Sequence, residues 1–158
     1  MALNAYLKLK GQNQGDIKGS GPENKIMVIA SNHSILSPRN ESSGIAIGKR
    51  MHKPFVITKE VDQSTPQLYK ALVDNENISE WELQFWKPDT SGAEMQYYTV
   101  KLNNATIASI EFHMPNNKDH QLMKFMEYEE IAFTYQDIEW IWEESGVSAS
   151  ADWVATGE

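Results

Sequence analysis

Apolar and polar residues alternate with a period of two along most of this chain. Apolar residues hold every second position in four well-separated runs, at 3–9, 81–85, 98–102 and 108–114. Successive side chains of a β-strand point to opposite faces, so each run predicts a strand with one buried face. Residues 26–35 predict a further strand, and residues 48–60 contain one more, with Phe55 and Ile57 on one face.

Two places should interrupt this alternation. Apolar residues fall on odd positions over 131–135 and on even positions over 138–142. A pleated strand cannot change parity without an extra residue, which predicts a bulge or a break at Gln136-Asp137. Asn103-Asn104 separates two strand runs, and because Asn tolerates a positive φ we expect a tight hairpin there.

One segment has helical spacing instead. In STPQLYKALVDNEN, residues 64–77, Thr65 is a candidate cap and Pro66 takes the favoured first helical position. Leu68, Ala71 and Leu72 then form an apolar stripe. The segment predicts one short amphipathic helix.

The segment 36–54 has a different composition. It contains Pro38, Gly44, Gly48 and Pro54, and it is too long for an ordinary connection. We expect a hairpin that protrudes from the body of the protein. A lone two-stranded ribbon is only marginally stable in water, so such an arm needs a partner surface.

Many short strands, a single helix and frequent turns predict a mainly β fold, a two-sheet β-barrel or sandwich. The length of 158 residues fits a single domain spanning 1–158. There are no cysteines, and no apolar run approaches the roughly 18 residues that a membrane span requires. The N-terminus lacks the features of a secretory signal, so we expect synthesis and folding in the cytosol.

Charge is distributed unevenly. Residues 1–70 hold ten Lys and Arg and five Asp and Glu, whereas residues 125–158 hold nine acids and no base. Lys49, Arg50 and Lys53 crowd around His52 in a chain whose net charge is -8. This asymmetry fits a solvated acidic face, or a subunit whose basic end meets the acidic end of a neighbour.

The evidence for catalytic or binding residues is weak in each case. His52 has no carboxylate or serine at a recognisable catalytic spacing, and a surface or interface histidine is the better interpretation. His113 and His120 do not fall on one face, so no metal site is expected. Paired glutamates at 127–130 and 143–144 fit solvated strand faces. Trp81, Trp140 and Trp142 lie in the apolar phase of their strands, which indicates core positions.

Four collinear segments then point to a family. They are AYLKLKGQNQGDIKGS at 5–20, GKRMHKPFVITKEVD at 48–62, YTVKLNNATIASIEFHMP at 98–115, and FTYQDIEWIWEESG at 133–146 followed by ADW. Together they resemble the Hcp family, the haemolysin-coregulated proteins that build the inner tube of the type VI secretion system. The turn after Gly19 is shorter than in the family, and one acid precedes Trp153 where relatives often have two.

The resemblance implies a structural subunit and no enzyme activity. Hcp proteins form hexameric rings that stack into a tube, are exported from the cytoplasm without a signal peptide, and carry small effector proteins in some cases. The implied partners are other copies of the chain, a spike protein of the valine-glycine-repeat type, a contractile sheath and small effectors. Neither a cofactor, nor nucleic acid, nor a membrane is implied.

We expect the 36–54 loop to dock on a neighbouring subunit or on the next ring. The candidate interface residues are Ile45, Ile47, Lys49, Arg50, His52, Lys53 and Ile107. Exposed ion pairs contribute only about 0–1 kcal/mol each, so apolar contacts should close the assembly while charges set its register. The alternative function is a soluble ligand- or carbohydrate-binding β-sandwich that uses surface aromatic residues.

Overall fold

The computed structural model describes residues 3–154. Its elements, in chain order, are β1 (Ala5–Gly11), β2 (Gly15–Ile17), the 3-10 turn η1 (Pro22–Asn24), β3 (Ile26–Val28), β4 (Ala30–Asn32), β5 (Ile35–Leu36), β6 (Met51–His52), β7 (Phe55–Glu60), α1 (Thr65–Val73), β8 (Ile78–Pro88), β9 (Glu94–Asn103), β10 (Thr106–His113), β11 (Tyr128–Thr134), β12 (Asp137–Trp142) and β13 (Val147–Asp152). None of the helices in this range has the length and apolar character needed to cross a membrane.

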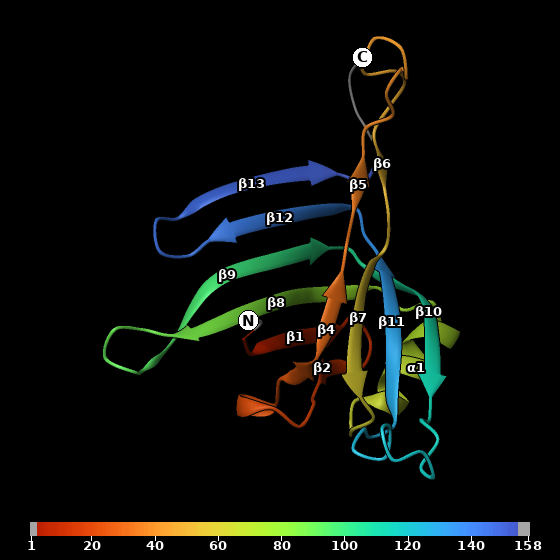
Figure 1. The fold of residues 1–158 in the computed structure, drawn as a ribbon, viewed down its shortest axis with the longest axis vertical. Helices are drawn as coiled ribbons and strands as arrows, with labels where there is room; N and C mark the ends of the chain where they lie inside the picture. The colour runs from red at the N-terminus through yellow and green to blue at the C-terminus, as the bar shows by residue number, and fades with distance from the viewer. Residues whose placement is uncertain (1–2, 155–158) are drawn as a thin grey trace.

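Two antiparallel sheets form the body. Sheet A has the order β13-β12-β9-β8-β1-β2, with β3 also paired to β1, and sheet B has the order β10-β11-β7-β4. The strands of sheet B run across those of sheet A, and the ribbon β5–β6 projects from one end of the body (Figure 1). The expected mainly β fold, with two sheets, one short helix and a protruding hairpin, is confirmed.

The core lies between the two sheets, with Trp81 near its centre. The Trp81 ring meets the rings of Phe55 and Phe133 edge to face, at centroid distances of 5.1 and 5.6 Å. Leu7 from β1 and Ile131 from β11 are fully buried in the same cluster. Each fully buried side chain of this kind contributes about 1.5–3 kcal/mol, so the period-two pattern accounts for most of what joins the sheets.

The break expected at Gln136-Asp137 is confirmed. Strand β11 ends at Thr134 in sheet B, and β12 begins at Asp137 in sheet A. The change of parity therefore marks the point where the chain passes from one sheet to the other.

The expected hairpin at Asn103-Asn104 is wrong, because β9 and β10 belong to different sheets. Asn104 does adopt a positive φ of 50°, but the turn carries the chain across the core instead of back along the same sheet. A tight turn of this kind fixes a change of direction, and it does not by itself specify pairing.

Two expected core assignments are also wrong. The register of β10 against β11 shifts between Ile107 and Ser109, which turns Ile107 inward and leaves Phe112 exposed. Trp142 lies at the end of β12 and is 41% exposed. The helix begins as expected at Thr65-Pro66, although Ser64 is the N-cap residue and makes no side-chain capping bond.

A buried ion pair connects β7, β11 and the start of α1. Lys59 Nζ donates to Glu129 Oε1 at 2.7 Å, and both side chains are fully buried. The same ammonium group lies 3.1 Å from Asp62, and the Thr65 hydroxyl donates to Glu129 Oε1 at 2.9 Å. Burial alone would raise the pKa of Asp62, but hydrogen bonds from Ser64 and the charge of Lys59 lower it below its ordinary value.

Replacing Glu129 tests this network. In Glu129→Gln the buried ammonium group of Lys59 loses a charged partner, and we expect a loss of about 3 kcal/mol in unfolding free energy. The double variant Lys59→Met/Glu129→Leu should recover much of that loss, because it removes the fully buried pair and leaves only the Asp62 carboxylate without its cation. Urea unfolding measures both, with Lys70→Met as the control, since Lys70 forms an exposed pair with Asp74. A cost for Glu129→Gln no larger than the cost of that control would contradict the assignment.

Candidate assembly surfaces

The protruding hairpin, here called the arm, comprises residues 35–52. Only Ile35↔His52 and Leu36↔Met51 pair as strands, with a further isolated bridge between Arg39 and Ala46. At the tip the Asn40 side chain accepts the backbone N–H groups of Ser42 and Ser43. The arm therefore has an ordered turn at its tip, but few internal contacts that would hold it extended away from the body.

A chain of side-chain hydrogen bonds ties the arm to the body. Arg50 Nε donates to His52 Nε2 at 3.1 Å, so this nitrogen carries no proton. His52 Nδ1 must then donate to the Tyr135 hydroxyl at 2.7 Å, and Tyr135 in turn donates to His33 Nε2 at 2.9 Å. We call these four residues the base hydrogen-bond chain. Arg50, His52 and Tyr135 each donate once and His33 accepts at the end of the chain, so the neutral forms of both imidazoles are required.

The surroundings favour those neutral forms. Burial, and then the nearby Arg50 guanidinium, lower the pKa of His52. Burial, and then the neighbouring His52, lower the pKa of His33. Burial also raises the pKa of Tyr135 to about 12, so its hydroxyl remains a donor at neutral pH.

Residues at the end of sheet A also hold the root of the arm in position. Arg50 Nη2 donates to the backbone carbonyl of Asp152 at 2.9 Å, which joins the arm to β13. The Trp153 ring lies 4.9 Å from the Tyr135 ring, nearly perpendicular to it, and 5.8 Å from His52. The expectation of a surface His52 is therefore wrong, because this side chain is buried and has a structural role within one chain.

The remaining candidate interface residues differ in how exposed they are. Ile45 is 66% exposed near the tip of the arm, and Ile47, Lys49 and Lys53 are exposed as well. Arg50 is half-buried by the contacts just described. Ile107 is only 4% exposed and packs in the core, so it cannot contribute to a contact between chains. This corrects its expected place on the polar face of β10.

A second apolar surface lies at the other end of the molecule. The β10–β11 connection is at the end of the longest axis opposite to the arm (Figure 1). An open pocket of about 510 Å³ there, the end pocket, is lined mainly by apolar side chains. Its lining residues are Ile29, Thr58, His113, Met114, Pro115, Leu122, Phe125 and Tyr128. This surface was not predicted from the sequence, although the spacing of Leu122, Phe125 and neighbouring methionines within a polar loop was a signal.

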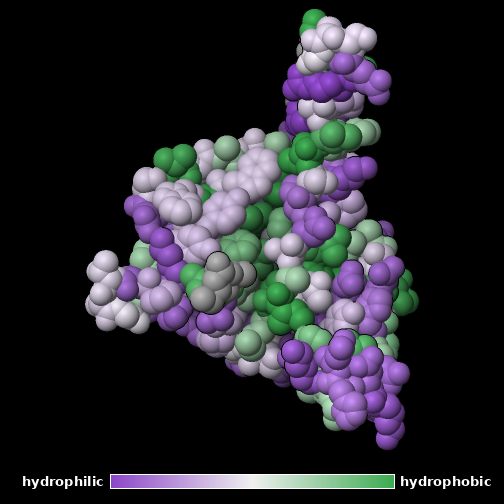
Figure 2. Space-filling model, in the orientation of Figure 1, coloured by the Kyte–Doolittle hydropathy of each residue, from purple (hydrophilic) through white to green (hydrophobic). Residues whose placement is uncertain are grey.

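Apolar side chains also reach the surface between sheet A and β4. A shallow groove of about 410 Å³ lies there, lined by Leu3, Ala5, Val28, Ile29, Ala30, Ser31, Phe85 and Tyr97. Figure 2 shows the hydrophobic surface running down the middle of this face, with hydrophilic surface on both sides. Exposed apolar area of this kind is typical of contact surfaces between proteins.

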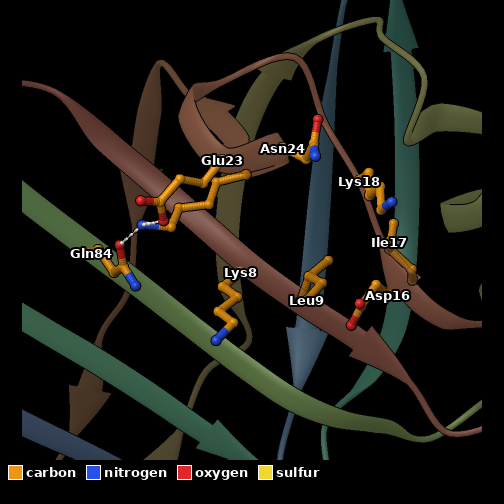
Figure 3. Close-up of a pocket in the computed structure, with 9 residues that line it drawn as sticks. Lys8, Leu9, Asp16, Ile17, Lys18, Glu23, Asn24 and Gln84 are labelled. Atoms are coloured by element: carbon orange, nitrogen blue, oxygen red, sulfur yellow. Dashed lines mark hydrogen bonds and ion pairs between the residues drawn. The ribbon is translucent and has the colours of Figure 1, made fainter.

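A polar depression lies beside β1 and β2, and Figure 3 shows the residues that line it. Three lysines line it, but Lys8 pairs with Glu80 at 3.2 Å and Lys25 pairs with Glu23 at 3.4 Å. Lys25 also donates to Gln84 at 2.8 Å. Most of the positive charge is thus compensated inside the chain.

Strand β13 is an edge of sheet A without the usual protection. Its sequence VSASAD contains neither proline nor lysine, and nearly all of its residues are exposed. Natural edge strands commonly carry such residues because a bare edge can pair with another chain. An unprotected edge is therefore available for contact with a neighbouring protein.

The base hydrogen-bond chain predicts a pH dependence of stability. The unfolded chain binds protons at its histidines near the ordinary pKa of about 6.5, whereas the folded chain resists them. Stability should therefore be complete above that pH and fall as the pH is lowered below it. Urea midpoints across this range measure the fall, and the double variant His33→Asn/His52→Asn should flatten it.

His120→Asn is the matched control, because His120 is exposed in the β10–β11 connection. An unchanged pH slope in the double variant would contradict the roles given to His33 and His52.

Comparison with known proteins shows the family of this chain. The chain matches the family described as "Type VI secretion system effector, Hcp" over residues 6–142. It is 36% identical to the "Major exported protein" of Pseudomonas aeruginosa, covering 97% of this chain and 96% of that protein.

Solved structures show the same relationship. A crystal structure of an Hcp protein is 31% identical, with a TM-score of 0.89, and covers 98% of this chain and all of the other. The secreted protein Hcp3 of Pseudomonas aeruginosa is 32% identical, with a TM-score of 0.78 and the same coverage. The matches in sequence and in fold extend over nearly the whole chain, which therefore belongs to the Hcp family of type VI secretion proteins.

Proposed function

We propose that this chain is the structural subunit of a type VI secretion tube, in which hexameric rings stack with the same polarity. One observation carries the proposal. The arm exposes apolar side chains at one end of the longest axis, and the end pocket exposes an apolar surface at the opposite end. Two different surfaces at opposite ends make a heterologous contact, which extends into a filament instead of closing as a dimer.

The strength of this contact fits a tube that must both form and come apart. Ile45 and Ile47 are the apolar residues nearest the tip, and full burial of each contributes about 1.5–3 kcal/mol before the cost of association. One such contact is weak. In a ring several contacts form together, and each further one becomes effectively intramolecular.

Ring closure needs a second heterologous contact around the circumference. The unprotected edge β13 offers hydrogen-bonding groups, and the acidic C-terminal part of the chain complements the exposed lysines of the 36–54 loop, Lys49 and Lys53. Charge complementarity would set the register of neighbouring subunits, while backbone pairing and apolar contacts would supply most of the affinity.

The family relationship supports an exported, non-catalytic role. A relative of this chain is named for its export, and we infer that this chain is likewise held in the cytoplasm and then secreted. A spike protein of the valine-glycine-repeat type, a contractile sheath and small effectors are the proposed partners. Hydrolytic or redox activity has no part in this role.

Trp81, Trp142 and Tyr97 do not support the alternative function of a carbohydrate-binding sandwich. Trp81 is buried, and the exposed Trp142 meets Tyr97 edge to face. The Lys87 ammonium group lies 4.9 Å from the Tyr97 ring and 5.7 Å from the Trp142 ring. A sugar-binding platform needs an open aromatic face, and here a lysine lies against both rings.

A disulfide trap tests the stacking contact. The chain has no cysteine, so Ile45→Cys/Phe125→Cys supplies the only two thiols. If the arm of one chain reaches the end pocket of another, oxidation should link chains into a ladder on a non-reducing gel. A disulfide forms only where the two Cα atoms approach to within about 7 Å, so the ladder reports direct contact.

The matched control is Ile45→Cys/Val73→Cys, since Val73 is an exposed apolar residue on α1. Each single-cysteine variant can form no more than a dimer. Dimers alone from the Phe125 pair, or equal ladders from both pairs, would contradict the proposed contact.

A further inference from the structure

Three potential metal ligands meet on the outward face of sheet B. Glu111 pairs directly with Glu130 across β10 and β11, and His113 follows two residues along β10. Because side chains alternate along a strand, the register alone places these three side chains on one face. Their ligand atoms all lie within 4.8 Å of one another. We call them the edge cluster, since β10 is an edge strand.

The distances inside the edge cluster are close to those of a coordination shell. His113 Nε2 lies 3.6 Å from Glu130 Oε1 and 4.0 Å from Glu111 Oε2, too far for a hydrogen bond. Ligand atoms about 2.1 Å from a tetrahedral metal are separated by about 3.4 Å. Small rotations of the two exposed carboxylates would bring all three atoms to that separation.

A second observation concerns the imidazole itself. His113 Nε2 is enclosed by surrounding atoms and has no hydrogen-bond partner. The ring stacks on Tyr128 at a centroid distance of 5.0 Å and an interplanar angle of 20°, which fixes its direction. An enclosed polar atom without a partner is unfavourable, and a bound ligand would remove that cost.

The opposed glutamates are unfavourable without a cation. Like charges directly across an antiparallel pair destabilise a sheet. In the described residues neither Glu111 nor Glu130 lies within 4.0 Å of a lysine or arginine, and His113 is the only basic group at that distance. A divalent cation between the carboxylates would turn this repulsion into attraction.

We propose that Glu111, His113 and Glu130 form a binding site for a first-row divalent metal ion, with Zn²⁺ the best match to one imidazole and two carboxylates. Three protein ligands leave one tetrahedral position for water or for a further ligand. The site adjoins the end pocket, because His113 also lines that pocket. The proposal does not depend on assembly, since all three ligands come from one chain.

Titration of the full-length chain with ZnCl₂ at pH 7 tests the site, with isothermal calorimetry as the readout. We expect one Zn²⁺ per chain. His113→Ala should weaken binding at least tenfold, because loss of supporting groups alone typically costs 10–100-fold. Glu130→Gln should also weaken it, and both variants should keep the unfolding midpoint of the parent in EDTA.

His120→Ala is the matched control, since this exposed histidine lies outside the edge cluster and should leave binding unchanged. The same titration monitored by imidazole NMR should shift the His113 resonances first. Absence of binding at millimolar Zn²⁺ would overturn the proposal, and would leave His113 as a simple ion-pair partner of the glutamates. Equal losses in His113→Ala and His120→Ala would overturn it as well.

Discussion

The position of the arm depends on the base hydrogen-bond chain formed by Arg50, His52, Tyr135 and His33. The strand pairing of the arm covers only two residues on each side, which is too little to hold a ribbon away from the body. The hydrogen-bond chain supplies the missing constraint, because it connects the root of the arm to the ends of β4 and β11. His52 is buried as a member of this hydrogen-bond chain, so it is not a surface residue.

A fixed arm makes the two ends of the molecule's longest axis different from each other. The arm and the end pocket lie at opposite ends of the longest axis, so a copy placed in line presents a pocket to an arm. The bipolar charge and the unprotected edge β13 add a second direction, around a ring. The basic residues that surround His52 therefore have two roles. Arg50 holds the root of the arm, whereas Lys49 and Lys53 remain exposed, as the proposed contact with another chain requires.

The sequence predicts those parts of the structure that depend on local periodicity. The strands, the helix starting at Thr65-Pro66, the arm and the break at Gln136-Asp137 all follow from residue spacing. Strand pairing and the burial of individual side chains do not follow from spacing, because they depend on residues that are distant in the sequence. The shift in register after Ile107 is set by contacts with β11, and the burial of His52 by Tyr135. The edge cluster needs the register of Glu111 against Glu130, which no spacing within one strand reveals.

The central claim is that copies of this chain fit one another through unlike surfaces until a ring closes. Native mass spectrometry of the purified, unmodified chain at high concentration tests it most directly. The account predicts a dominant species with six times the mass of one chain, with multiples of that species as rings stack. A spectrum of single chains alone, unchanged as concentration rises, would contradict it.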